Sequence, residues 1–262
     1  MEKIIRKICK KLEKEHKIKI LFCVENGSRA WNMSSKDSDY DVRFVFVRSL
    51  PEYLQIHLSR DVIEAYFDAN GKKSSQENAL IDVVGFDIFK YVKMLSSSNP
   101  QTTEWLTSTI VYYGKQNKLF KSYAMNNFSR IALYHHYKSM CRQNYLKYLK
   151  SGELVTYKKY LYAFRGLVNA KWIAHKNALP PTDFPETLRK VKNLIPLSVI
   201  KKLEDIIALK SEGKEKEIIQ NIVSMDSYIE SFLKDDTEAP KEKSHSTLNA
   251  LNKELRKIVL SN

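Results

Sequence analysis

The apolar residues in the first third of the chain follow a helical spacing once and a strand pattern several times. Ile4, Ile8 and Leu12 recur with Ile5 at steps of three and four among charged residues, which predicts an amphipathic helix over residues 2–16. Four later runs are rich in β-branched and aromatic residues, which predicts strands. These runs cover residues 20–24, 40–47, 60–67 and 80–85.

The character of the chain changes after residue 98. The first predicted strand ends at Asn26-Gly27-Ser28, a combination typical of a tight turn, and the fourth leads into a helix over residues 87–95. From residue 99 onward, helical periodicity replaces the strand pattern. The helices predicted there cover residues 102–107, 115–123, 130–149, 155–176, 185–192, 198–209, 215–233 and 247–260.

This order of elements predicts an α+β fold. We expect a small mixed sheet with helices on one face over residues 1–98, followed by a helical domain over residues 99–234. The stretch DDTEAPKEKSHS, which begins at Asp235, is poor in apolar residues. We therefore expect residues 235–262 to form a mobile linker and a short terminal helix.

Composition describes a folded, strongly basic protein. A hydrophobic fraction of 43% with 11% aromatic residues excludes a disordered chain. The formal charge of +14 favours a polyanionic partner, although lysine-rich usage also follows from an AT-rich genome. Lys and Arg are dense from Lys115 to Lys216. If the partner is RNA, the sequence places its binding in the helical domain.

The cysteines and the hydropathy indicate where the protein works. Cys9, Cys23 and Cys141 are odd in number and widely spaced, so we interpret them as reduced structural thiols. No apolar run approaches the roughly 20 residues needed to span a bilayer. Residues 1–19 alternate charges with Ile and Leu, unlike a signal peptide. We expect a cytoplasmic protein without a membrane partner.

Three aspartates form the candidate metal and catalytic set. Residues two apart on a strand share a face, so Asp39 and Asp41 project together at the start of YDVRFVFV. Adjacent carboxylates repel each other unless a cation separates them, and Mg²⁺ prefers a few carboxylates plus phosphate oxygens. Asp82 lies inside an apolar strand, where its charge is costly to bury without a metal or a proton. Together they predict a site for two Mg²⁺ ions, with Mn²⁺ as the alternative.

The turn before the aspartates suits phosphate groups. Gly27 and Ser28 offer backbone N–H groups and a hydroxyl at the end of a buried strand. A DxD pair or a Gly-Ser turn is common by itself, but their order here, followed by a lone Asp on a later strand, is far more specific. Asp87 is a weaker alternative to Asp82, because a carboxylate just before an apolar helical segment is typical of an N-cap.

The segment GSRAWNMSSKDSDYDVRFVFV, which begins at Gly27, resembles the signature of the polymerase β-like nucleotidyltransferases. Other stretches resemble a narrower, predicted nucleotidyltransferase family that is linked to RNA repair operons and also found in phages. They are residues 60–64, the strand with Asp82 followed by residues 85–87, residues 98–100 before residues 104–106, and residues 158–160 leading through Tyr162 and Arg165 to Trp172. The resemblance covers most of residues 20–190.

This resemblance implies a metal-dependent enzyme that moves a nucleoside monophosphate from a nucleoside triphosphate, such as ATP, to an acceptor hydroxyl and releases pyrophosphate. It also implies that Gly27 and Ser28 bind phosphates and that Asp39, Asp41 and Asp82 bind metal. All three acidic positions are filled. We expect RNA or tRNA as the acceptor, in repair or modification. The alternatives are a protein acceptor and a non-catalytic RNA-binding module.

Two arginines near the turn have open roles. Arg29 follows Ser28 and either reaches the triphosphate or lies on the surface of the first helical turn. Arg43 shares a strand face with Asp39 and Asp41. It either neutralises the acidic cluster or forms an exposed cross-strand pair.

A later helix carries further candidates for nucleotide binding. Within residues 155–176, Lys158, Tyr162 and Arg165 share a face with Asn169. A cationic stripe that includes an aromatic ring suits a triphosphate and a stacked base, and a solvated helix face is the alternative. Lys159 is the adjacent alternative to Lys158. We expect the active site between the sheet domain and the helical domain.

Overall fold

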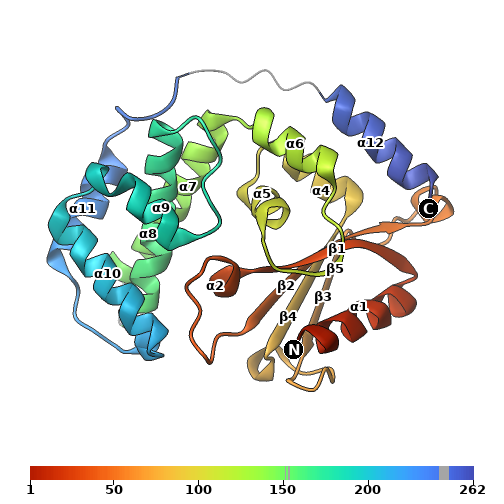
Figure 1. Ribbon diagram of the computed structural model, residues 1–262, viewed down its shortest axis with the longest axis horizontal. Coiled ribbons are helices and arrows are strands. Elements are labelled where there is room, and N and C mark those ends of the chain that lie inside the picture. Colours follow the sequence, from red (N-terminus) through yellow and green to blue (C-terminus); the bar gives the residue numbers. More distant parts are fainter. Residues whose placement is uncertain (151, 153, 242–247) are drawn as a thin grey trace. The chain divides into compact units, whose positions relative to one another are not determined.

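The computed structural model describes residues 1–150, 152, 154–241 and 248–262. The chain divides into two compact units, whose elements are labelled in Figure 1. The first unit contains Met1–Ala30, Asp39–Phe128 and His245–Asn262. The second unit contains Trp31–Ser38 and Ser129–Ser244. A short segment between the Gly-Ser turn and the DxD pair therefore belongs to the helical unit.

The first unit is built on a five-stranded mixed sheet of order β3-β4-β2-β1-β5. The strands are β1 (Ile18–Asn26), β2 (Tyr40–Arg48), β3 (Val62–Phe67), β4 (Ile81–Asp87) and β5 (Val111–Gly114). Strands β2 and β4 run parallel, and the other neighbouring strands are antiparallel. The predicted mixed sheet is confirmed. Strand β5 was not predicted, because a four-residue edge strand is too short to show a clear alternation.

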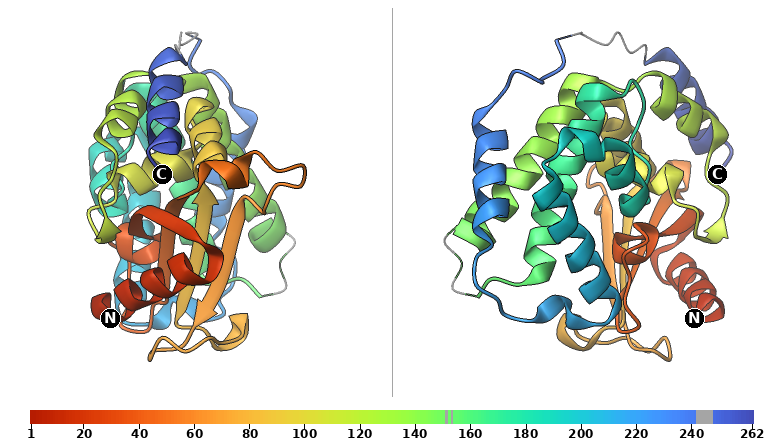
Figure 2. Two further views of the ribbon diagram at one scale, coloured as in Figure 1. Left: turned by 90° about the vertical axis from the view of Figure 1, so that its right-hand side faces the viewer. Right: turned by 60° about the vertical axis from the view of Figure 1, so that its left-hand side comes forward.

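The helices of the first unit cover both faces of this sheet (Figure 2). They are α1 (Glu2–His16), α2 (Gly27–Ala30), α3 (Leu50–Tyr53), α4 (Ile88–Ser96), α5 (Pro100–Thr107), α6 (Lys118–Asn126) and α12 (Asn249–Leu260). The prediction of helices on one face was wrong, because β2 is apolar on both sides. Phe44 and Phe46 pack in one hydrophobic cluster with the buried residues of α1, and the alternate residues Val45 and Val47 are buried on the other side.

The second unit is helical, as predicted. Its elements are α7 (Arg130–Asn144) with a π-helical turn (Tyr145–Lys150), α8 (Tyr157–His175), α9 (Phe184–Val191), α10 (Leu197–Ser211) and α11 (Val223–Lys234). One predicted boundary was wrong, since the helix expected from residue 215 begins at Val223. Lys214–Lys216 form a 3-10 turn, and the residues between it and α11 are extended because Ile218 bridges Thr156 and the Ile219 N–H donates to the Val155 carbonyl at 2.9 Å.

The ends of the two units differ from the domain limits predicted from sequence. The first unit extends to Phe128 rather than ending at residue 98, and it also includes the C-terminal helix α12. Helix α12 is the predicted terminal helix, and it packs on α4, α6 and β2. Residues 242–246 of the predicted linker lie outside the described residues. The division of roles between domains stays a prediction.

Candidate active site

Two of the three predicted carboxylates lie side by side on the central strands. In the parallel pair β2 and β4, Asp41 is in register with Asp82. Aligned residues of neighbouring strands project from the same face of a sheet. Because β1 is the neighbour of β2 on the other side and pairs Asn26 with Asp41, the turn at Gly27 emerges at the same end of the sheet.

Arg43 bridges the two carboxylates. Its Nη2 donates to Asp41 Oδ1 at 2.9 Å and to Asp82 Oδ2 at 3.0 Å. Its Nη1 donates to the carbonyl oxygens of Val42 and Asp82, both at 3.0 Å. The Arg43 side chain is only 14% exposed, and those of Asp41 and Asp82 are about one third exposed. A guanidinium thus neutralises the acidic pair, which is one of the two roles that the sequence left open for Arg43.

The remaining carboxylate oxygens face other parts of the site. Asp82 Oδ1 is buried, and no residue that the structure describes forms a hydrogen bond to it. Asp41 Oδ2 lies against Gly27, where an added β-carbon would be 1.8 Å from that oxygen. Gly27 also has a φ of +63°, a conformation that favours glycine. Both observations require glycine at this position.

Asp39 is not grouped with the other two. It precedes β2, and its side chain is exposed. Its carbonyl oxygen accepts a hydrogen bond from Arg29 Nε at 3.2 Å. Among the described residues, no three His, Cys, Asp or Glu side chains are arranged to hold a metal ion. The structure therefore brings together Asp41 and Asp82, and the third ligand stays a prediction.

A buried glutamate behind the pair was not selected by sequence reasoning. Glu25 is fully buried; its Oε1 accepts the Asp41 N–H at 2.8 Å, and its Oε2 accepts the Tyr112 hydroxyl. Burial raises the pKa of the Glu25 carboxyl to about 7. Glu25 thereby holds the backbone of Asp41 in place. An acidic residue at the end of the apolar run ILFCVEN was the available signal.

Arg29 turns back toward the start of β2. Its guanidinium lies 3.8 Å from the centre of the Tyr40 ring, and its Nε contacts the carbonyl of Asp39. Ser28, in the same short helix α2, is partly exposed. The Gly-Ser turn and the start of β2 are thus joined by one side chain within the first unit.

The predicted nucleotide-binding residues of α8 have partners inside the helical unit. Lys158 Nζ is 3.8 Å from Glu215 Oε1, and Lys159 Nζ donates to the Leu154 carbonyl. Arg165 is buried, and its guanidinium stacks 3.6 Å from the centre of the Trp31 ring. Arg165 therefore packs against Trp31 inside the protein. Its position on the predicted cationic face did not indicate this contact.

Trp31 fastens the segment after the Gly-Ser turn to the helical unit. Its ring meets the Tyr162 ring edge-on at 6.0 Å, and its carbonyl accepts the Phe184 N–H at 3.0 Å. The neighbouring Asn32 donates to the side chain of Asp183 at 3.0 Å. Sequence reasoning missed this role, although a tryptophan in an otherwise polar loop was a visible signal.

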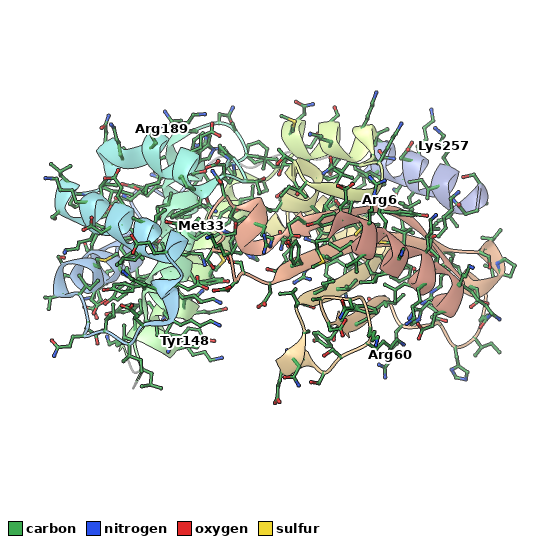
Figure 3. All side chains as sticks on the ribbon, turned by 60° about the horizontal axis from the view of Figure 1, so that its bottom comes forward. Arg6, Met33, Arg60, Tyr148, Arg189 and Lys257 are labelled. Atoms are coloured by element: carbon green, nitrogen blue, oxygen red, sulfur yellow. The ribbon has the colours of Figure 1, made fainter. Side chains whose placement is uncertain are left out.

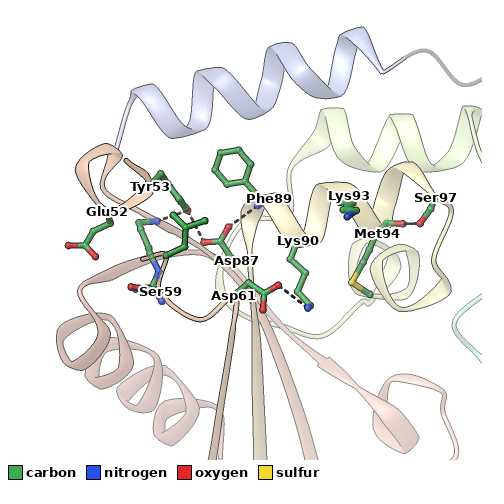
Figure 4. Close-up of a pocket in the computed structure, with 12 residues that line it drawn as sticks. Glu52, Tyr53, Ser59, Asp61, Asp87, Phe89, Lys90, Lys93, Met94 and Ser97 are labelled. Carbon is green, nitrogen blue, oxygen red and sulfur yellow. Dashed lines mark hydrogen bonds and ion pairs between the residues drawn. The ribbon is translucent and has the colours of Figure 1, made fainter. Parts of the chain in front are cut away.

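A cavity of about 650 Å³ lies at the other end of β2 and β4 (Figure 4). Asp87 lines it, caps α4 through the Phe89 N–H at 2.9 Å, and accepts the Tyr53 hydroxyl at 2.8 Å. Its register partner is Phe46, five residues along β2 from Asp41. Asp87 is therefore an N-cap remote from the acidic pair, and Asp82 is the carboxylate beside Asp41.

Comparison with known proteins identifies the family. Residues 1–257 match the RNA repair pathway DNA polymerase beta family. The chain belongs to this family. The resemblance inferred from the Gly-Ser turn and the aspartates is thereby confirmed, and the family and the α+β architecture indicate a polymerase β-like nucleotidyltransferase.

Two individual proteins are similar to this chain. A Bacillus subtilis protein named YcgL, described as uncharacterized, is 33% identical over 238 residues, which cover 89% of this chain and 85% of that protein. The crystal structure of a nucleotidyltransferase-like protein from Exiguobacterium sibiricum aligns with 98% of this chain and 88% of its own, at 11% identity and a TM-score of 0.31. No helix in the described part of the chain is both long and apolar enough to cross a membrane.

Proposed function

We propose that this family member transfers a nucleoside monophosphate from a nucleoside triphosphate to a hydroxyl group of RNA. The observation that carries the proposal is the in-register pair of Asp41 and Asp82 beside the Gly27 turn. Strand pairing places two carboxylates and a backbone turn at one end of the sheet, where a triphosphate tail and an acceptor hydroxyl can meet. The family description supports RNA as the acceptor.

The donor set fits hard divalent cations. Asp41 and Asp82 provide carboxylate oxygens, the ligands that Mg²⁺ prefers, and Asp82 Oδ1 is buried without a hydrogen-bond partner among the described residues. We assign Asp39 as the third ligand, with Mg²⁺ as the expected ion and Mn²⁺ as the alternative. When bound, such ions neutralise the phosphate charge and favour deprotonation of the acceptor hydroxyl.

The residues of the chain then have distinct tasks. Gly27 and Ser28 bind the β- and γ-phosphates through backbone N–H groups and the Ser28 hydroxyl. The acceptor oxygen forms a bond to the α-phosphorus, and the bond from this phosphorus to the oxygen bridging the β-phosphate breaks. Pyrophosphate leaves, and the proton of the acceptor hydroxyl passes to the carboxylate of Asp82.

Two lysines of α8 are further candidates for nucleotide binding. Lys158, which is 38% exposed, and Lys159 are our candidates for contacts with the nucleotide. Arg165 acts at a distance, since it stacks on Trp31, which follows α2 directly in the chain. Arg29 holds the turn against β2 and keeps its charge near the phosphate-binding residues.

The proposal is tested by incorporation of labelled nucleoside triphosphates in the presence of Mg²⁺. Single-stranded RNA, tRNA and a mixture of proteins are offered in turn as acceptors, with Asp82→Asn as the inactive control. We expect metal-dependent labelling of RNA and release of pyrophosphate. Labelling of protein alone would replace RNA by a protein acceptor, and no labelling of any acceptor would contradict nucleotidyl transfer.

A further inference from the structure

Helix α1 carries a row of lysines that the proposed chemistry does not use. Lys3, Lys7, Lys10 and Lys14 follow one another at steps of four, three and four residues, which places them on one face of the helix. All four are exposed. Lys3 and Lys14 are eleven steps apart in the chain, which corresponds to roughly 16 Å along the helix axis. We call these four residues the α1 lysine row.

The α1 lysine row is not neutralised by the fold. None of its members forms an ion pair with a residue that the structure describes. Lys7, Lys10 and Lys14 line a shallow, open groove on the surface of α1 together with Lys11 and Glu15. Glu15, the one acid in that groove lining, pairs with Lys73, whose ammonium lowers the pKa of this carboxyl. The groove therefore presents nearly undiluted positive charge.

Several lysines of the helical unit differ in this respect. Lys138 is buried and paired with Asp236 at 2.7 Å, and Lys171 is buried and paired with Glu238 at 2.6 Å. Further ion pairs in this unit join Lys150 to Glu230, Lys158 to Glu215, Lys190 to Glu186 and Lys210 to Glu215. The density of Lys and Arg in the helical sequence thus overstates the charge that is free to bind a polyanion.

The position of α1 connects its lysines with the proposed active site. The chain reverses at Lys17, so α1 runs antiparallel to β1, whose last residue pairs with Asp41. Ile4, near the start of α1, packs against Gly71 in the connection that leads into β4 and Asp82. The first members of the lysine row therefore lie toward the end of the sheet that carries the acidic pair, on the face opposite to Asp41 and Asp82, whose neighbours Val42 and Val83 pack with α1.

We infer that the α1 lysine row binds the phosphates of the RNA acceptor and directs the strand toward the end of the sheet with Asp41 and Asp82. This inference rests on the proposed RNA acceptor. Charge complementarity favours RNA, because each phosphate that meets a lysine releases a counterion. A membrane surface is disfavoured because Ile5, Ile8 and Leu12, the apolar side of α1, are buried against the sheet. Arg6, which is labelled on α1 in Figure 3, is not counted with the row because its guanidinium is paired with Glu2.

The experiment compares two variants of the full chain that lose the same charge. One replaces the α1 lysine row with Gln, as Lys3→Gln, Lys7→Gln, Lys10→Gln and Lys14→Gln. The control replaces four exposed lysines on helices that cover the other face of the same sheet, as Lys118→Gln, Lys121→Gln, Lys253→Gln and Lys257→Gln. Circular dichroism verifies that both are folded. Binding of a fluorescent single-stranded RNA is then measured by anisotropy across a salt series.

We expect the α1 variant to bind RNA about tenfold more weakly, with a salt slope reduced by roughly 0.7 for each lysine that contacts a phosphate. The control variant keeps an affinity and slope close to those of the wild type. Equal losses in both variants would overturn the inference, since net charge alone would then explain them. Unchanged RNA binding by the α1 variant would also overturn it. Binding to anionic phospholipid vesicles is measured in parallel, and a loss of vesicle binding alone would overturn the inference in the same way.

Incorporation of labelled nucleotide into the same RNA separates this inference from the proposed function. If the wild type labels RNA and the α1 variant binds RNA as tightly as the wild type, the inference about the α1 lysine row is wrong and the proposed function stands. If the α1 variant loses RNA affinity as expected but the wild type labels no RNA, the binding surface stands and the proposed transfer to RNA is wrong.

Discussion

The carboxylate of Asp41 lies so close to Gly27 that a β-carbon on residue 27 would sit 1.8 Å from Asp41 Oδ2 and 2.6 Å from Asp41 Cγ. The backbone of Gly27 also has a positive φ of 63°. The turn that is proposed to bind phosphates and the carboxylate that is proposed to bind metal therefore form one packed unit. A side chain at residue 27 must displace one of them.

Gly27→Ala should lower nucleotide incorporation by about 100-fold, since a displacement of about 1 Å at a reacting centre has an effect of that size. The positive φ adds a stability loss of about 1–2 kcal/mol. Gly213→Ala is the matched control, because Gly213 has a φ of +84° and no atom of the described residues lies within 4 Å of an added β-carbon. Urea unfolding should show the loss from the positive φ in both variants and a further loss in Gly27→Ala from the clash with Asp41, with incorporation lost only in Gly27→Ala. Wild-type incorporation by Gly27→Ala would contradict the role of this contact.

Arg43→Gln should make the stability of the protein depend more strongly on Mg²⁺. Without the guanidinium, Asp41 and Asp82 repel each other, and we expect a loss of about 1–2 kcal/mol in the metal-free protein. Added Mg²⁺ should restore more stability than it adds to the wild type, because the cation no longer competes with Arg43. Thermal unfolding with and without Mg²⁺ measures this difference. The double variant Arg43→Gln, Asp82→Asn should lose the extra gain, and equal gains in all three proteins would refute the assignment.

Asp39→Asn tests the proposed third ligand. The side chain is exposed, so the substitution should change the free energy of unfolding by no more than about 0.5 kcal/mol. Incorporation should nevertheless fall by about 100-fold, because an amide is a poor replacement for a charged ligand of Mg²⁺. Asp37→Asn, also exposed and two residues away, is the control that should retain activity. Normal turnover by Asp39→Asn would remove this residue from the metal site.

Arg165→Lys tests whether this residue positions the loop after the turn or binds the triphosphate. Lysine keeps the charge but cannot stack on Trp31 as a planar guanidinium does. We expect kcat to fall about tenfold with little change in KM for the nucleotide. Trp31→Ala should reproduce this loss, and Trp31→Phe, which keeps an aromatic ring, should recover much of it. A rise in KM without a fall in kcat would instead assign Arg165 to direct nucleotide binding.

Asp87→Asn should change how stability depends on pH. Burial raises the pKa of the Asp87 carboxyl above its ordinary value of about 3.9. Above pH ~4 the native protein therefore keeps a proton that the unfolded chain has lost, so this carboxyl lowers stability as pH rises through that window. Asparagine can still cap α4 but does not titrate. Urea unfolding at several pH values should show a smaller decline for the variant, and identical pH profiles would contradict the effect of burial.

The elements that were predicted correctly are those whose cause lies within a few residues. The helical spacing of Ile5, Ile8 and Leu12 reports a buried helix face, and all three are buried in α1. The apolar runs of β1, β2 and β4 likewise mark strands with both faces covered. Local periodicity was uninformative for β5, and it misplaced the start of α11, where pairing with residues 155 and 156 keeps the chain extended.

The sequence by itself determined the family, the order of the Gly-Ser turn and the acidic residues, and the choice of residue types that can bind metal and phosphate. Only the tertiary structure decided which of these residues meet. The parallel register of β2 and β4 places Asp82 beside Asp41 and puts Asp87 at the far end, and it lets Arg43 reach both carboxylates. Strand register and the attachment of Trp31 to α8 depend on packing between segments that are distant along the chain, which no local pattern of residues records.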